Sequence, residues 1–113
     1  MKGKISRSND EIIRSLKNRE IQSIKTLYDN YSSSLLGIIS LLVSDEELRL
    51  EILEKTFLRI WQESEKHEPI NSTLFIWMMK LAIEVSAECM DLQLAEIREK
   101  FWQAYKELRK NIQ

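Results

Sequence analysis

The side chains that could carry covalent or metal chemistry are few and far apart in this sequence. His67 is the single histidine and lies near Pro69, and Cys89 is the single cysteine. No glycine-rich phosphate loop, metal-ligand spacing or nucleophile–base arrangement is present. The Asp and Glu clusters fall at the starts of predicted helices, where they stabilise the helix macrodipole. The sequence therefore predicts a protein that is not an enzyme and that binds no metal and no cofactor.

Composition limits the class of protein further. The chain has 113 residues, 43% of them apolar and 31% charged, with a net charge of −1. This length suits one domain, and the near-zero charge excludes an overwhelmingly basic nucleic-acid-binding domain. The single cysteine permits no intrachain disulfide, the first residues do not read as a signal peptide, and no apolar run approaches the roughly 20 residues of a membrane span. We therefore expect a cytoplasmic protein without a membrane partner.

The spacing of apolar residues is helical throughout, and the two glycines and one proline leave little punctuation for hairpins. We expect an all-α, compact bundle of five or six helices. Residues 1–92 would form the main helical domain, and residues 93–113 an amphipathic helix that packs on it or on a partner chain. The predicted elements are a short helix opened by a capping box at 8–11, a helix over 20–31, a turn or junction at 32–34, a buried helix over 35–43, a helix from the capping box at 44–47 to about 66, a loop at 67–72, a helix over 72–90 and a last helix over about 92–110.

The stretch LEILEKTFLRIWQE, residues 50–63, predicts a helix with two distinct sides. The side expected in the core holds Leu50, Leu53, Phe57, Ile60 and Trp61. The opposite side holds Glu47, Glu51, Glu54, Lys55, Leu58 and Gln62. A polar face with one leucine is either a solvated face or a surface that binds another protein.

Three segments in order carry a resemblance to a known family: DEIIRSLKNREIQSIKTLYDNYSSSLLGII, SDEELRLEILEKTFLRIWQESEK and STLFIWMMKLA. Over about residues 9–92 the chain resembles the second conserved region of bacterial RNA polymerase sigma factors of the extracytoplasmic-function (ECF) type. The resemblance implies that the helix matching 46–64 docks on the clamp helices of the polymerase largest subunit. It also implies that the helix matching 73–91, with the loop before it, grips and melts the −10 promoter element.

The chain departs from this family where the family's function lies. The docking helix of the family reads Asp-x-x-Gln-Glu-x-Phe, and here the matching positions are Glu51, Glu54, Lys55 and Phe57, so one charge is reversed. After its Trp, the promoter helix of the family reads approximately Ile-Ala-Arg-Asn, then an Asp and further Arg residues. Here the sequence reads Leu81, Ala82, Ile83 and Glu84, then Glu88, with no Arg before Arg98, and the acidic Glu84, Glu88 and Asp91 add repulsion toward phosphate. Lost cations weaken phosphate binding, so we expect promoter DNA binding to be weak or absent. The remaining candidate nucleic-acid contacts are Asn71, Ser72, Thr73 and Lys80, and Trp77 is either a base-stacking residue or part of the core.

A second apolar side of the 72–90 helix lies opposite the Leu81 stripe. It is formed by Ile76, Met79, Ile83 and Met90. A helix that is apolar on two sides is normally buried on both. We expect the stripe Leu94, Ile97, Phe101, Tyr105 and Leu108 of the last helix to cover this side, within the chain or across a homodimer. A break near Asp91, which could cap the start of the last helix, would allow the first arrangement.

Two functions remain open from the sequence. The first is a sigma-factor-like transcription initiation module that binds RNA polymerase core through the 46–62 helix, with weakened promoter DNA binding. The alternative is a degenerate sigma-like interaction module without DNA binding, such as a decoy for an anti-sigma factor or a self-associating regulator.

Overall fold

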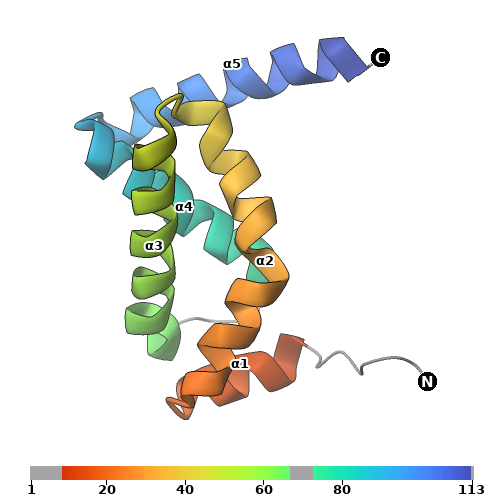
Figure 1. Cartoon of the computed structure of the whole chain (residues 1–113), viewed down its shortest axis with the longest axis vertical. Coiled ribbons are helices and arrows are strands. Elements are labelled where there is room, and N and C mark those ends of the chain that lie inside the picture. Colours follow the sequence, from red (N-terminus) through yellow and green to blue (C-terminus); the bar gives the residue numbers. More distant parts are fainter. Residues whose placement is uncertain (1–8, 67–72, 113) are drawn as a thin grey trace.

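The computed structural model describes residues 9–66 and 73–112, which form five α-helices and one short 3-10 helix. In chain order these are α1 (Asn9–Lys17), α2 (Ile21–Leu42), α3 (Glu46–Glu63), η1 (Ser64–Lys66), α4 (Leu74–Met90) and α5 (Leu94–Ile112). Helices α2 and α3 run side by side, α4 lies behind them, α1 crosses one end of the bundle and α5 crosses the other (Figure 1). The prediction of an all-α bundle of five or six helices is confirmed. No helix within the described ranges is long and apolar enough to cross a membrane.

One hydrophobic core joins all five α-helices. Its largest fully buried side chains include Leu16 of α1, Leu27 and Ile39 of α2, Ile60 of α3, Met78 of α4 and Ile97 of α5. Full burial of one such side chain contributes about 1.5–3 kcal/mol to folding. Helix α1 also buries Ile12 and Ile13.

Helix α2 is continuous, and the predicted turn at Ser32–Ser34 is wrong. Leu27, Leu35 and Ile39 are spaced by whole or near-whole helical turns, and each has an exposed fraction of 0%. Serine disfavours a helix interior by only a few tenths of a kcal/mol, which is less than the burial of one of these side chains. The tertiary contacts therefore carry the helix through the serine run.

The start of α3 also differs from the prediction. Asp45, not Ser44, occupies the N-cap position, and its side chain makes no capping hydrogen bond. The connection between α2 and α3 is held instead by Arg49, whose Nε donates to the carbonyl of Val43 at 2.6 Å, at the end of α2. Ser8 of the other predicted capping box and the predicted loop at 67–72 lie outside the described residues.

The junction of α4 and α5 is a sharp reversal. Asp91 has φ 57°, the amide of Leu92 donates to the carbonyl of Ala87 at 2.9 Å, and the amide of Asp91 donates to that of Glu88 at 3.2 Å. These two bonds form the Schellman motif that ends a helix at a left-handed residue. Asp91 therefore ends α4 and does not cap α5, whose start is held by the amide of Gln93 donating to the Glu96 carboxylate at 2.9 Å. The expected break is present, and α5 folds back on the bundle.

Only the first half of α5 packs on the bundle. Ile97 and Phe101 are buried and Leu94 is half-buried, against α2 and α4. Tyr105 and Leu108 are 39% and 43% exposed, so the expectation that the whole stripe would be covered is wrong for these two. The reason is geometric: α5 crosses the end of the bundle, and its last turns extend past α2 (Figure 1).

Candidate docking surface

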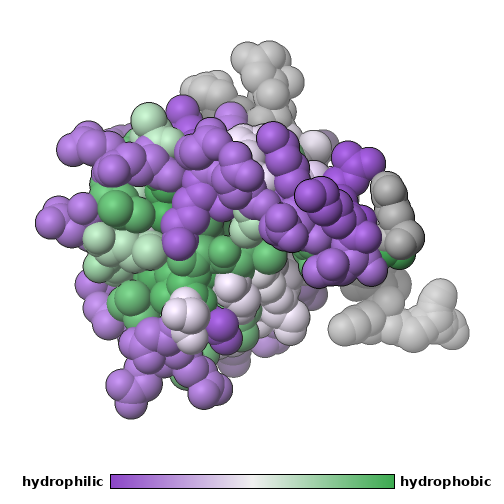
Figure 2. Space-filling model, turned by 90° about the horizontal axis from the view of Figure 1, so that it is seen from above, coloured by the Kyte–Doolittle hydropathy of each residue, from purple (hydrophilic) through white to green (hydrophobic). Residues whose placement is uncertain are grey.

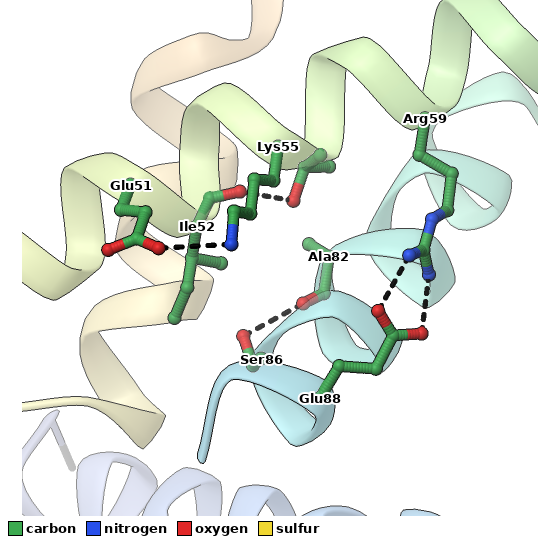
Figure 3. Close-up of polar contacts among 8 residues, drawn as sticks. Glu51, Ile52, Lys55, Arg59, Ala82, Ser86 and Glu88 are labelled. Carbon is green, nitrogen blue, oxygen red and sulfur yellow. Dashed lines mark hydrogen bonds and ion pairs between the residues drawn. The ribbon is translucent and has the colours of Figure 1, made fainter. Parts of the chain in front are cut away.

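The outward side of α3 holds all six residues that the sequence placed there. Glu47, Glu51, Glu54, Lys55, Leu58 and Gln62 are exposed, and Leu58 has 55% of its surface open to solvent. The ammonium of Lys55 lies 3.0 Å from the carboxylate of Glu51, one helical turn away (Figure 3). This hydrogen bond raises the pKa of Lys55. The face is acidic, with an apolar side chain near its centre.

The buried side of α3 is rotated from its predicted position. Leu53, Phe57 and Ile60 are buried as expected, but Leu50 is 53% exposed and Trp61 only half-buried. Ile52 and Thr56, which the sequence did not assign to the core, are fully buried. The Thr56 hydroxyl donates to the carbonyl of Ile52 at 2.7 Å, so its burial leaves no hydrogen-bonding group unpaired (Figure 3). The core side is shifted because α3 packs against both α2 and α4.

Helix α2 adds apolar side chains to the same surface. Ile21 is 64% exposed and Tyr28 is 46% exposed. An open hollow of about 280 Å³ is lined by Ile21, Ile24, Phe57, Leu58 and Trp61. A second hollow of about 420 Å³ is lined by Tyr28, Leu50, Glu51, Leu53 and Glu54.

We call these residues together the α2/α3 surface: Ile21, Ile24, Tyr28, Glu47, Leu50, Glu51, Glu54, Lys55, Phe57, Leu58, Trp61 and Gln62. Its chemistry is an apolar strip with two hollows beside a mainly acidic ridge. Exposed apolar side chains gathered in one place, rather than scattered singly, are typical of a protein-binding surface. The signal in the sequence for the α2 part was the number of apolar residues on that helix, which is too many for one buried side.

One arginine fixes the edge of the α2/α3 surface. Arg19 lies in the turn between α1 and α2 with φ 61°, and its guanidinium carbon is 3.9 Å from the centroid of the Trp61 ring. Its Nη1 donates to the carbonyl of Trp61 at 2.6 Å and to the hydroxyl of Ser64 at 3.1 Å. Ser64 in turn lies 3.5 Å from the carbonyl of Leu16. This arrangement, the Arg19 clamp, ties the end of α1 to the end of α3 and positions Trp61 in the hollow.

The α4 side shows a different arrangement from the one predicted. Ile83 is buried, Met79 and Met90 are half-buried, and Ile76 is 36% exposed, so the second apolar side is only partly covered. Lys80 is exposed, but the hydroxyl of Thr73 already accepts the amide of Ile76 at 3.2 Å as the N-cap of α4. Asn71 and Ser72 lie outside the described residues.

A bidentate ion pair links α3 to α4. Arg59 Nη1 and Nη2 lie 2.8 Å and 2.6 Å from the two carboxylate oxygens of Glu88 (Figure 3). These hydrogen bonds lower the pKa of Glu88 and raise the pKa of Arg59. Glu88 was predicted to repel phosphate, and the structure adds that it also occupies the guanidinium of Arg59.

Residues 9–66 and 73–112 hold no group of three His, Cys, Asp or Glu side chains that could bind a metal ion.

Comparison with known proteins supports a distant relation to one class. No protein-family model matches the sequence, and no solved structure matches it. The chain is similar to bacterial RNA polymerase sigma factors of the ECF type. The relatives are the ECF RNA polymerase sigma factor SigK of Mycobacterium sp. strains KMS and JLS and the RNA polymerase sigma factor SigK of strain MCS, each 22% identical over 73 residues. The match covers 65% of this chain and 38% of each relative, so it spans well under half of their length.

The Arg19 clamp gives the first prediction. Arg19→Ala should lower the free energy of unfolding by about 1–2 kcal/mol, because a cation–π contact and charge-assisted hydrogen bonds are lost together. Arg19→Gly should cost less, since glycine adopts a positive φ without strain. Urea melts followed by Trp fluorescence would measure both, with exposed Arg14→Ala as the control. Equal stability of all four proteins would show that the clamp does not hold α1 to α3.

The Arg59–Glu88 pair predicts a pH dependence. The lowered pKa of Glu88 means that the pair stabilises the fold above the ordinary carboxyl value of 4.5. This contribution should be lost as the pH falls through the lower, folded-state pKa. The Glu88 side chain is 58% exposed, so solvent screening limits the contribution to about 0.5 kcal/mol. Glu88→Gln should flatten the stability curve on its acid side, below about pH 4.5, and Glu54→Gln, a change at an exposed position of α3, is the matched control.

Proposed function

We propose that this chain is a sigma-factor-like transcription initiation module that docks on RNA polymerase core through the α2/α3 surface. The observation that carries the proposal is the exposure of Leu58 and of the hollow beside it. These residues lie on the helix that, in the family the chain resembles, contacts the polymerase. The distant similarity to ECF sigma factors supports the same role. The proposed role is binding, without catalysis and without a cofactor.

The chemistry of the surface suits a helical partner with basic and apolar residues. Buried aromatic and apolar anchors supply most of the affinity of such interfaces. Leu58, Trp61 and Tyr28 would be the anchors, and Glu47, Glu51 and Glu54 would set the orientation of the partner through charge. Lys55 introduces a positive charge where the family carries a negative one, which should weaken the usual contact.

The alternative is an interaction module without DNA binding, whose partner is an anti-sigma factor. The features that favour it are on α4. Glu84 and Glu88 stand where the family carries cations, and Glu88 holds Arg59, a cation that would otherwise be free for a phosphate. Each cation lost from a phosphate contact reduces both affinity and its dependence on salt.

Capture of purified RNA polymerase core by the tagged full chain tests the docking proposal. Leu58→Asp should weaken capture by about ten-fold or more, because a charge would enter an apolar contact. Its urea melt should shift by less than about 0.5 kcal/mol, as expected for an exposed site. Ile76→Asp, an apolar-to-acid change at an exposed position of α4, is the matched control and should leave capture unchanged.

Lys55→Glu separates the two candidate partners. For a polymerase contact of the family type, the reversal restores the family's charge and should strengthen capture of core. Weaker capture, or capture of an anti-sigma factor that only the native Lys55 permits, would support the alternative. If the wild-type chain captures no RNA polymerase core, the docking proposal is refuted.

Binding of promoter DNA should be weak. A single strand carrying a −10-like sequence, titrated at low and moderate salt, should bind no tighter than the micromolar non-specific range. Glu88→Gln should tighten binding, because it removes a negative charge and releases Arg59. Sub-micromolar binding by the wild-type chain with a steep salt dependence would contradict this prediction.

A further inference from the structure

The projecting half of α5 carries an exposed stripe that its own bundle does not cover. Trp102, Tyr105 and Ile112 are 53%, 39% and 74% exposed. At 100° per residue, these side chains share an arc of about 120° with Lys106 and Arg109. Their spacing of three, four and seven residues is that of a helix that binds in a groove through one face. We call Trp102, Tyr105, Lys106, Arg109 and Ile112 the α5 stripe, which is apolar, aromatic and basic and differs from the stripe of the sequence analysis.

Aromatic contacts already order this stripe. The rings of Trp102 and Tyr105 meet edge to face with centroids 5.8 Å apart, and Tyr105 stacks on Phe101 at 6.4 Å. Phe101 is buried, so the stripe continues from the core outward along the helix. An ordered surface loses less conformational entropy on binding than a flexible one. Figure 2, seen from the end on which α5 lies, shows hydrophobic surface mainly on the left, where α4 joins α5, and mostly hydrophilic residues on the right, the side toward which α5 projects.

We propose that the projecting half of α5 binds the α2/α3 surface of a second copy of this chain. The argument is charge complementarity. Lys106 and Arg109 flank the apolar residues of the stripe, and Glu47, Glu51 and Glu54 flank those of the α2/α3 surface. The hollow beside Leu58 and Trp61 would receive an aromatic or branched side chain of the stripe. The inference rests on the proposed function in that it assigns a second, competing occupant to the same surface.

The same chain cannot supply both halves of this contact. The hollow beside Leu58 and Trp61 lies by the first turn of α2, near the end of the bundle that α1 crosses. Glu47, Leu50 and Glu51 lie on the first turns of α3, nearer the end that α5 crosses (Figure 1). The last turns of α5 nevertheless point past α2, away from α3 (Figure 1). The contact therefore has to form between two copies, and it would block the surface that the polymerase is proposed to use.

Pairing of two α5 stripes with each other is disfavoured by charge. Such a contact would bring Lys106 and Arg109 of one copy close to the same residues of the other, and like charges that meet in an interface oppose association. The acidic α2/α3 surface offers the opposite sign. The charges therefore favour α5 on the α2/α3 surface over α5 on α5.

Two charge-reversed full-length variants test the proposal by analytical ultracentrifugation. The first, Lys106→Glu with Arg109→Glu, has an acidic stripe and the native surface. The second, Glu51→Lys with Glu54→Lys, has the native stripe and a basic surface. Wild-type chain should self-associate with rising concentration, more weakly at high salt. Each variant alone should self-associate about ten-fold more weakly, and an equal mixture of the two should regain association, because both contacts in the mixed pair are again between opposite charges.

The outcomes distinguish this inference from the proposed function. A wild-type chain that stays monomeric at every concentration would overturn the inference, whether or not it captures polymerase core. Unchanged association of the second variant would also overturn it and would indicate that α5 pairs with α5. The first variant keeps the α2/α3 surface, so it should capture polymerase core at least as well as the wild type. Loss of core capture by the first variant with no change in self-association would also contradict the inference.

Discussion

The packing of α3 between α2 and α4 decides what the rest of the molecule can do. On one side Phe57 meets Tyr28 of α2, with ring centroids 5.0 Å apart, and on another Arg59 meets Glu88 of α4. Ile52, Thr56 and Ile60 fill the space between these contacts and are fully buried. One arc of the helix is left facing outward, and Leu58 is near its centre. The exposure of that leucine is thus a consequence of how the core is filled, and the α2/α3 surface exists because two helices, rather than one, hold α3.

Burial of α4 has the opposite consequence for nucleic-acid binding. Met78, Leu81, Ala82 and Val85 are buried because α2, α3 and α5 all contact this helix. The exposed side chains of α4 are Ile76, Lys80 and Glu88, and Glu84 is half-buried, so this helix offers a phosphate backbone one cation beside two carboxylates. In the sigma family that the chain resembles, this helix is the promoter-gripping element. Here its packing and its two carboxylates support the proposal that DNA binding is weak.

The sequence predicted the helices well because their apolar residues repeat with the helical period, and it located the outward side of α3 for the same reason. It failed where tertiary contacts outweigh local preference. Burial of Leu27, Leu35 and Ile39 carries α2 through its serine run. The partners of α3 rotate its core side away from Leu50, which periodicity alone could not reveal. The Arg19 clamp was invisible because its residues are 42 and 45 positions apart in the chain.

Self-association through the α2/α3 surface would make polymerase docking depend on the concentration of the chain. A partner that binds only the free surface has its apparent affinity reduced by the fraction of chains in which that surface is open. At low concentration nearly every chain would be free to dock, and at high concentration most would be occupied by another copy. Salt would act on both contacts in the same direction, because both use the acidic ridge of α3.

Lys55 modulates the charge of the α2/α3 surface. It forms an ion pair with Glu51 and so reduces the negative charge that either occupant meets. If each of two basic partners binds this surface only weakly, neither holds it permanently. Modest changes in the concentration of either partner then change which of the two occupies the surface.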